Sequence, residues 1–184
     1  MDSGSIDSIQ RARDQIAELT PDEQWAFLIN HLDPVDGYGR FETDLPDTVE
    51  GEVTAHIFQL LHTLSHILLK QASTISGFDR TNLSEFLFPR ALSLVIYANN
   101  REEFNIGGMN TMVEQQLDNL LGQAESRGND CVYDPVCSHR GGACLSCLHV
   151  SEISCSYFNQ ILGRDYLYGS RPNTEREIFG YWEL

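Results

Sequence analysis

Basic residues are scarce in this chain. Its 184 residues include 12 Lys or Arg against 27 Asp or Glu, which gives a formal net charge of −15, and Lys70 is the single lysine. Proteins that bind nucleic acid by neutralising phosphates usually show the opposite balance. Free-standing DNA or RNA binding is therefore disfavoured, although a subunit that works inside a larger complex is still compatible with this charge.

The chain also lacks the patterns of secreted, membrane-spanning and common catalytic proteins. Residues 1–5 have no basic or apolar leader character, and polar side chains interrupt the most apolar stretch, residues 57–69. No P-loop, GxSxG or paired-carboxylate pattern is present. We therefore expect a cytoplasmic protein that neither crosses a membrane nor acts as an enzyme.

Cysteine is absent from the first 130 residues, and five cysteines then fall within 25 residues. Such clustering is typical of metal ligands in a reducing cytoplasm, and Cys144-Leu145-Ser146-Cys147 is a CxxC turn in which two thiolates can hold one ion. We expect one structural zinc, because four thiolates leave no coordination position open for water. The expected ligands are Cys137, Cys144, Cys147 and Cys155.

Other assignments of these cysteines remain open. Cys131 is an alternative ligand or a small buried thiol, and His139 and His149 are nearby nitrogen donors. The cysteines could also be ordinary free thiols. A redox pair at Cys144 and Cys147 is a further alternative, but no βαβ pattern surrounds them.

A second candidate group lies on a predicted helix. Apolar residues recur at steps of three and four from residue 50 to residue 73, which predicts a helix that ends near Ser76-Gly77. His62 and His66 lie four residues apart on one face, a spacing that can hold a metal, but no Glu follows the first His as in HExxH. The pair is interpreted as buried hydrogen-bonded histidines, a partner or nucleic-acid contact, or a second metal site.

These patterns predict an α+β protein: a helix-rich single domain with a small sheet and a C-terminal structural zinc site, preceded by a short acidic helical arm. The first 50 residues carry twelve acidic and three basic side chains and predict two short helices, over residues 5–19 and 20–32. We expect an arm and linker over residues 1–50, a zinc-binding domain over 51–169 and a tail over 170–184.

Inside the domain, β-branched and aromatic residues predict a strand over residues 91–98, whereas residues 84–90 do not distinguish helix from strand. We expect further helices over 111–123 and 156–162, the second with Cys155 at its N-terminus. Gly107-Gly108 predicts a tight turn, with close approach of the backbone to a phosphate as the alternative.

An ordered set of motifs resembles one known domain. The motifs are Leu61-His62-Thr63-Leu64-Ser65-His66, Ser76-Gly77-Phe78, Leu94-Val95-Ile96-Tyr97, Gly107-Gly108, Cys131-x-x-Asp134-Pro135-Val136-Cys137, Ala143-Cys144-Leu145-Ser146-Cys147-Leu148, Glu152-Ile153-Ser154-Cys155, Asn159 and Arg164-Asp165. Together they resemble the cysteine-rich C-terminal domain of MrfA-type DNA-repair helicases and of the DrmB subunit of the DISARM anti-phage system. The resemblance covers roughly residues 55–169.

The resemblance implies a zinc-binding appendage of large helicases, in which all five cysteines of this chain match family cysteines. Because no ATP-binding motif is present, we expect a detached accessory subunit that joins a separate helicase or nuclease in bacterial defence or DNA repair. Nucleic acid would be contacted only through that complex. Two alternatives stay open: a metal-dependent hydrolase that uses His62 and His66, and an acidic DNA mimic that inhibits a DNA-binding enzyme.

Overall fold

The computed structural model describes residues 49–79, 81–99, 103–169 and 180–183. These residues form an α+β structure, in which helices accompany a two-stranded antiparallel sheet. The two short helices expected over residues 5–19 and 20–32, and most of the expected tail, lie outside the described residues. Within the described ranges, no helix combines the length and the hydrophobicity needed to cross a lipid bilayer.

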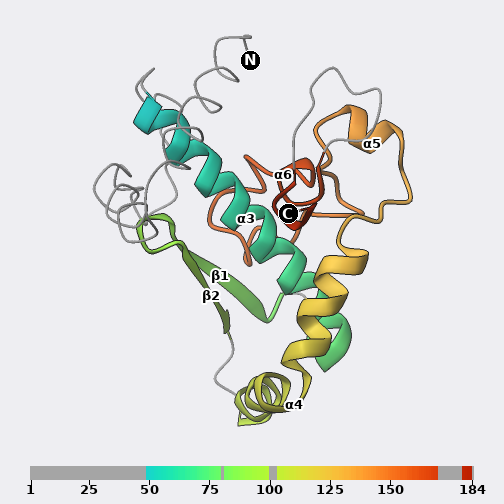
Figure 1. Cartoon of the computed structure of the whole chain (residues 1–184). Coiled ribbons are helices and arrows are strands. Elements are labelled where there is room, and N and C mark those ends of the chain that lie inside the picture. Colours follow the sequence, from blue (N-terminus) through green and yellow to red (C-terminus); the bar gives the residue numbers. More distant parts are fainter. Residues whose placement is uncertain (1–48, 80, 100–102, 170–179, 184) are drawn as a thin grey trace.

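Helix α3, Val49–Ser76, confirms the helix predicted from periodicity and runs through the middle of the molecule (Figure 1). Its apolar side chains, including Phe58 and Ile67, are buried in two hydrophobic clusters. Between Leu61 and Lys70 almost every side chain is buried, so this part of the helix is covered on all sides. Gly77, with φ of 72°, follows the last turn, and its N–H donates to the Ser73 carbonyl at 3.1 Å.

The sheet packs on one side of α3. Strand β1, Leu83–Phe88, pairs with β2, Ser93–Ala98, in a register that sets Phe86 opposite Val95. The short 3-10 helix η1, Pro89–Ala91, joins the strands. Residues 84–90, for which the sequence did not distinguish helix from strand, thus lie mostly in a strand. The strand predicted over 91–98 begins two residues later than expected.

Helix α4, Glu103–Arg127, crosses the C-terminal end of α3 (Figure 1). It begins earlier than predicted because Gly107-Gly108 lies inside the helix, so the expected tight turn at these glycines is wrong. A side chain at Gly108 would bring Cβ within 2.6 Å of Cζ of the buried Phe78 ring. The glycine lowers helix propensity by about 1 kcal/mol, and close packing of α4 on Phe78 offsets that loss.

The C-terminal segment wraps around α3 through turns and two four-residue helices, α5, Val136–His139, and α6, Asp165–Tyr168. The helix predicted over 156–162 is wrong: the segment is a run of turns, with positive φ at Phe158, Asn159 and Ile161. The Asn159 side chain accepts from Val150 N at 2.8 Å and donates to Val150 O at 3.0 Å. These two bonds hold the backbone in turns, in place of helical hydrogen bonds.

The packing of α4 on Phe78 gives a direct test. We expect Gly108→Leu to destabilise the protein by about 1–3 kcal/mol through overpacking, measured as a lower urea midpoint. The control is Gly122→Leu on the same helix, where a Cβ meets nothing within 4 Å. Equal midpoints for the two variants would contradict the close contact at Gly108.

Candidate metal centre

The cysteine-rich segment folds back on itself after α4. Cys131 follows the end of that helix, Cys137 lies in α5, and Cys144 and Cys147 lie in the next turn. The Asp134 carboxylate accepts hydrogen bonds from the backbone N and the Oγ of Ser138 at 3.2 and 2.7 Å, and this fixes the start of α5. Leu148 N and His149 N both donate to the Cys144 carbonyl at 3.0 Å, which closes the CxxC turn.

These turns bring four sulfur atoms together, in a group that we call the four-cysteine cluster. The Sγ–Sγ distances are 3.6 Å for Cys131–Cys144, 3.7 Å for Cys137–Cys147 and 3.6 Å for Cys144–Cys147. Disulfide sulfurs lie about 2.05 Å apart, and all five cysteines are free thiols. Zn–S bonds of about 2.3 Å in a tetrahedron separate the sulfurs by about 3.75 Å. The four-cysteine cluster therefore has the spacing of a tetrahedral metal site.

The four-cysteine cluster differs in one member from the ligand set expected from the sequence. The structure groups Cys131 with Cys137, Cys144 and Cys147, and places Cys155 elsewhere. A turn in which Asp134 N donates to the Cys131 carbonyl at 3.1 Å folds Cys131 back towards the CxxC pair. His139 and His149 belong to neither four-residue group of potential ligands found among the described residues.

A buried arginine joins the loops around the four-cysteine cluster. The side chain of Arg164 is 1% exposed, and its Nη1 and Nη2 lie 3.2 and 2.8 Å from the two carboxylate oxygens of Asp134. Its Nε donates to the Gly142 carbonyl at 3.0 Å, and Nη1 also contacts the Asn129 carbonyl. One guanidinium thus fixes three separate segments and sets a positive charge beside the cysteines.

Two further contacts shape the CxxC turn. The ammonium of Lys70, on α3, donates to the carbonyls of Leu145 and Ser146 at 3.2 and 2.9 Å. Gly142 has φ of 70°, and a Cβ there would lie 3.2 Å from Arg164 N, so this position favours glycine for both reasons. The chain's single lysine and this glycine therefore both anchor the turn that carries two of the four thiols.

Ionisation of the thiols in the four-cysteine cluster is uneven. Burial raises the pKa of Cys137, and the neighbouring thiols of Cys144 and Cys147 raise it further. Burial also opposes ionisation of Cys144, but hydrogen bonds from the backbone N–H groups of Cys147 and Ser146 lower its pKa to about 7. Because adjacent thiolates repel one another, full ionisation of the cluster requires a cation among the sulfurs.

The predicted histidines lie in a second group, fully buried between α3, β1 and the C-terminal turns. His62 and His66 are brought together with Cys155 and with Glu85, which sequence reasoning missed. Glu85 occupies an inward position of β1, between the buried Leu83 and Leu87. A carboxylate among the inward-facing side chains of a strand needs a buried polar partner. The alternation of inward and outward side chains along β1 could therefore have identified Glu85 as a site residue.

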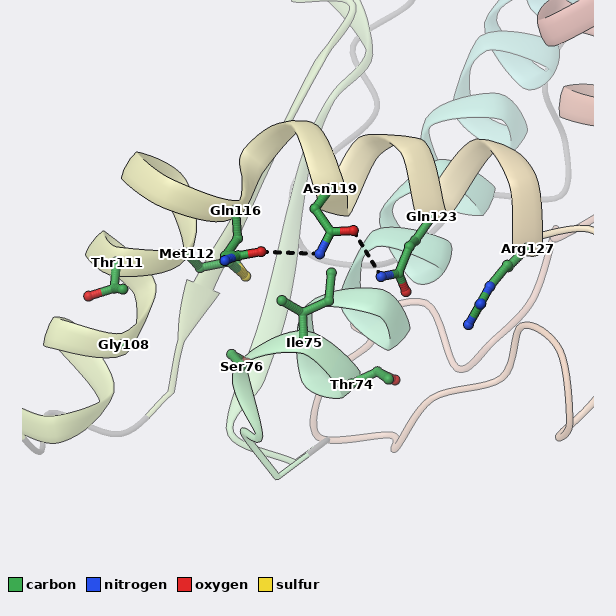
Figure 2. Close-up of a pocket in the computed structure, with 10 residues that line it drawn as sticks. All are labelled: Thr74, Ile75, Ser76, Gly108, Thr111, Met112, Gln116, Asn119, Gln123 and Arg127. Carbon is green, nitrogen blue, oxygen red and sulfur yellow. Dashed lines mark hydrogen bonds between the residues drawn. The ribbon is translucent and has the colours of Figure 1, made fainter.

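A groove of about 900 Å³ lies between the end of α3 and α4 (Figure 2). Figure 2 shows Gln116, Asn119 and Gln123 linked along α4, where Nδ2 of Asn119 donates to Gln116 at 3.1 Å and Nε2 of Gln123 donates to Asn119 at 3.0 Å. Arg127 is the charged residue among the ten lining residues. The lining contains no acid–base pair, so the two buried clusters remain the candidate sites.

The Arg164–Asp134 pair gives a prediction for the loops around the four-cysteine cluster. We expect Arg164→Met to destabilise the zinc-supplied protein by about 3–5 kcal/mol, because the mostly buried Asp134 carboxylate loses the positive charge of its ion pair. Urea unfolding measures the change. Arg140→Met serves as the control, since Arg140 is exposed in the same segment. A loss no larger than that of the control would show that the pair does not organise these loops.

A comparison with known proteins finds a relative that is similar to this chain in sequence. The chain is 28% identical over 124 residues to the DISARM protein DrmB of Bacillus paralicheniformis (strain ATCC 9945a / NCIMB 11709 / CD-2), with coverage of 60% of this chain and 22% of that protein. No family model matches the chain. The chain therefore spans less than a quarter of the length of this curated relative, and it is similar to one part of a DISARM protein.

Proposed function

We propose that this chain is a non-catalytic zinc-binding accessory subunit that associates with a helicase or nuclease in a bacterial anti-phage defence or DNA-repair complex. The observation that carries the proposal is the four-cysteine cluster in a chain similar to part of a DISARM protein. The similarity favours anti-phage defence over repair, because DISARM is the system that the relative's name gives.

Zinc is the ion that suits the four-cysteine cluster. Four thiolates in a tetrahedral arrangement are a donor set used for zinc in structural sites. Four thiolates around Zn²⁺ leave a net charge of −2, and the guanidinium of Arg164 and the ammonium of Lys70 lie close enough to compensate it. Such second-layer contacts usually accompany a structural metal site. The ion's bonds would order turns that contain little apolar surface. The residues that would hold it are Cys131, Cys137, Cys144 and Cys147.

A structural role for this ion follows from the number of ligands. Four cysteines fill a tetrahedral ion and leave no position for water or substrate. The hydrolase alternative uses His62 and His66, but both side chains are 0% exposed. A substrate would have no access to these rings without a rearrangement of α3 against the C-terminal turns. An accessory role therefore fits the buried geometry better than hydrolysis.

The outer face of the sheet supplies a surface for a partner. Phe86, Phe88, Val95 and Tyr97 are 41–47% exposed on this face, and the rings of Phe86 and Phe88 lie 4.7 Å apart. The opposite face of β1 packs into the core through Leu83 and Leu87. A contiguous apolar patch of this kind is typical of a protein–protein contact. We propose that the helicase or nuclease subunit covers it.

The zinc assignment predicts the effect of a cysteine change. We expect Cys144→Ser to lose the ion of the four-cysteine cluster and to disorder the turns that carry its four cysteines, because three thiolates bind zinc far more weakly than four. Metal analysis and near-UV circular dichroism measure the two effects. Ser146→Ala, within the same turn, is the control and should keep its metal. A Cys144→Ser protein with unchanged metal content and spectrum would contradict a structural zinc here.

The apolar outer face of the sheet gives a prediction about partner binding. We expect Phe86→Asp to abolish co-purification with the helicase or nuclease subunit from cells that produce both proteins, while the fold and the metal content stay unchanged. Leu117→Asp is the matched control, because Leu117 is similarly exposed, at 42%, but belongs to α4 and not to the sheet. Loss of the complex with Leu117→Asp but not with Phe86→Asp would assign docking to α4 and refute the sheet surface.

A further inference from the structure

We propose that His62, His66, Glu85 and Cys155 bind a second metal ion, a divalent transition metal for which zinc is the best fit, separate from the four-cysteine cluster. The four side chains come from α3, from β1 and from the C-terminal turns, and their donor atoms all lie within 4.8 Å of one another. This inference does not depend on the proposed function, because it rests on a different set of residues.

The donor atoms converge on one point. Oε1 of Glu85 lies 3.2 Å from Nε2 of His62 and 3.2 Å from Nε2 of His66, and Sγ of Cys155 lies 3.3 Å from Nε2 of His62. Zn–N and Zn–O bonds of about 2.1 Å and a Zn–S bond of about 2.3 Å give edges of about 3.4–3.6 Å in a tetrahedral site. The observed separations are those of neighbouring ligands around a single small ion, within a few tenths of an ångström.

The hydrogen bond between Nδ1 of His66 and a backbone carbonyl directs the other ring nitrogen at the proposed ion. Nδ1 of His66 lies 2.9 Å from the Leu148 carbonyl, which can only accept, so Nδ1 carries a proton. In the neutral ring Nε2 then presents a lone pair, and this lone pair faces the carboxylate oxygen of Glu85. Two lone pairs at this distance repel unless a cation lies between them or the ring takes up a second proton. In metal-binding histidines, the ring nitrogen that does not bind the metal commonly donates its proton to a backbone carbonyl in this way.

Two of the other ligands are also oriented by their surroundings. The second carboxylate oxygen of Glu85 contacts the Ser65 hydroxyl, which leaves Oε1 directed at the histidines. Nδ1 of His62 has no hydrogen-bond partner among the described residues, and its ring is held by packing against Phe58 and Tyr157, with centroids 5.4 and 5.2 Å away. Both donor atoms thus have a fixed direction towards the common point.

Backbone amides prepare Cys155 to bind as a thiolate. The N–H groups of Tyr157 and Asn159 donate to its Sγ, each at 3.4 Å. Glu85 N donates to the Ser154 carbonyl at 3.4 Å, which ties β1 to the turn that carries the cysteine. The turns that replace the expected helix over 156–162 are therefore the local structure that directs amide groups at this sulfur.

Charge balance supports a divalent ion. One thiolate, one carboxylate and two neutral imidazoles neutralise a 2+ ion, so the filled site would be electrically neutral in a region that water does not reach.

The proposed ion would be structural. The four side chains are 0–2% exposed, and together they fill a tetrahedral coordination sphere. The ion would join the centre of α3 to the strand and to the C-terminal turns, which are connected here by few regular backbone hydrogen bonds. It would act as a cross-link for the second hydrophobic cluster, which contains Phe58, Leu87 and Tyr157.

The experiment is a count of bound metal in the full-length chain after expression with added zinc. We expect two zinc ions per chain in the wild type and one in Glu85→Gln, because the amide keeps the size of the side chain but is a poor zinc ligand. The control is Glu152→Gln, an exposed glutamate three residues before Cys155, which should keep both ions. Cys144→Ser combined with Cys147→Ser should keep the ion of the second site alone.

The outcomes separate the two sites. One zinc per chain that is lost in the Cys144→Ser, Cys147→Ser protein and kept in Glu85→Gln would overturn the second site and leave the four-cysteine cluster intact. One zinc per chain that is lost in Glu85→Gln and kept in the Cys144→Ser, Cys147→Ser protein would support the second site and refute the zinc assignment of the four-cysteine cluster. Two ions in Glu85→Gln would show that the second ion lies elsewhere.

A spectroscopic measurement on the wild type avoids reliance on variants that fail to fold. X-ray absorption at the zinc edge should show nitrogen and oxygen neighbours together with sulfur, since the five cysteines would be shared between two ions. A spectrum with sulfur neighbours alone would mean that the histidines and Glu85 bind no zinc. In that case the cluster would be a hydrogen-bonded network with a protonated His66.

Discussion

The close packing of buried, ionisable side chains is the constraint on which the C-terminal part of this structure depends. Four thiols lie within 4.8 Å of one another in the four-cysteine cluster, and a thiol and a carboxylate lie together in the second group. Such groups stay together as anions only if positive charge is supplied nearby. Arg164 and Lys70 supply part of it around the four-cysteine cluster, and a metal ion at each centre would supply the rest.

Helix α3 connects the two centres. Lys70 reaches from it to the CxxC turn, and Thr63 Oγ1 accepts a hydrogen bond from Gly163 N at 3.1 Å. His62 and His66 reach the second group from the same helix. Three of the polar residues that interrupt its apolar stretch, His62, Thr63 and His66, are thus its contacts with the C-terminal segment. Burial of Thr63 and His66 is tolerated because partners from distant parts of the chain satisfy their polar atoms, whereas Nδ1 of His62 has no hydrogen-bond partner among the described residues.

The long elements could be predicted from the sequence, because periodicity and strand propensity are local signals. The helix over residues 50–73 and the strand over 91–98 follow from them, and the structure contains both. Gly107-Gly108 misled the prediction because the packing of Gly108 on Phe78 depends on a distant residue. The turns around Asn159 were missed for a similar reason, since its partner Val150 lies outside the segment predicted as a helix.

The grouping of the cysteines shows where spacing along the chain stops being informative. Cys131 and Cys155 lie on either side of the CxxC pair, and both are within reach of it in sequence. What separates them is the partner each meets: Asp134 and α5 fold Cys131 towards the CxxC turn, whereas β1 and α3 surround Cys155. The spacing of the cysteines along the chain carries no information about the Glu85 carboxylate, which reaches Cys155 from a distant strand. The inward position of Glu85 and the His62–His66 pair were each visible in the sequence. Only the packing of β1 on α3 makes them one site with Cys155.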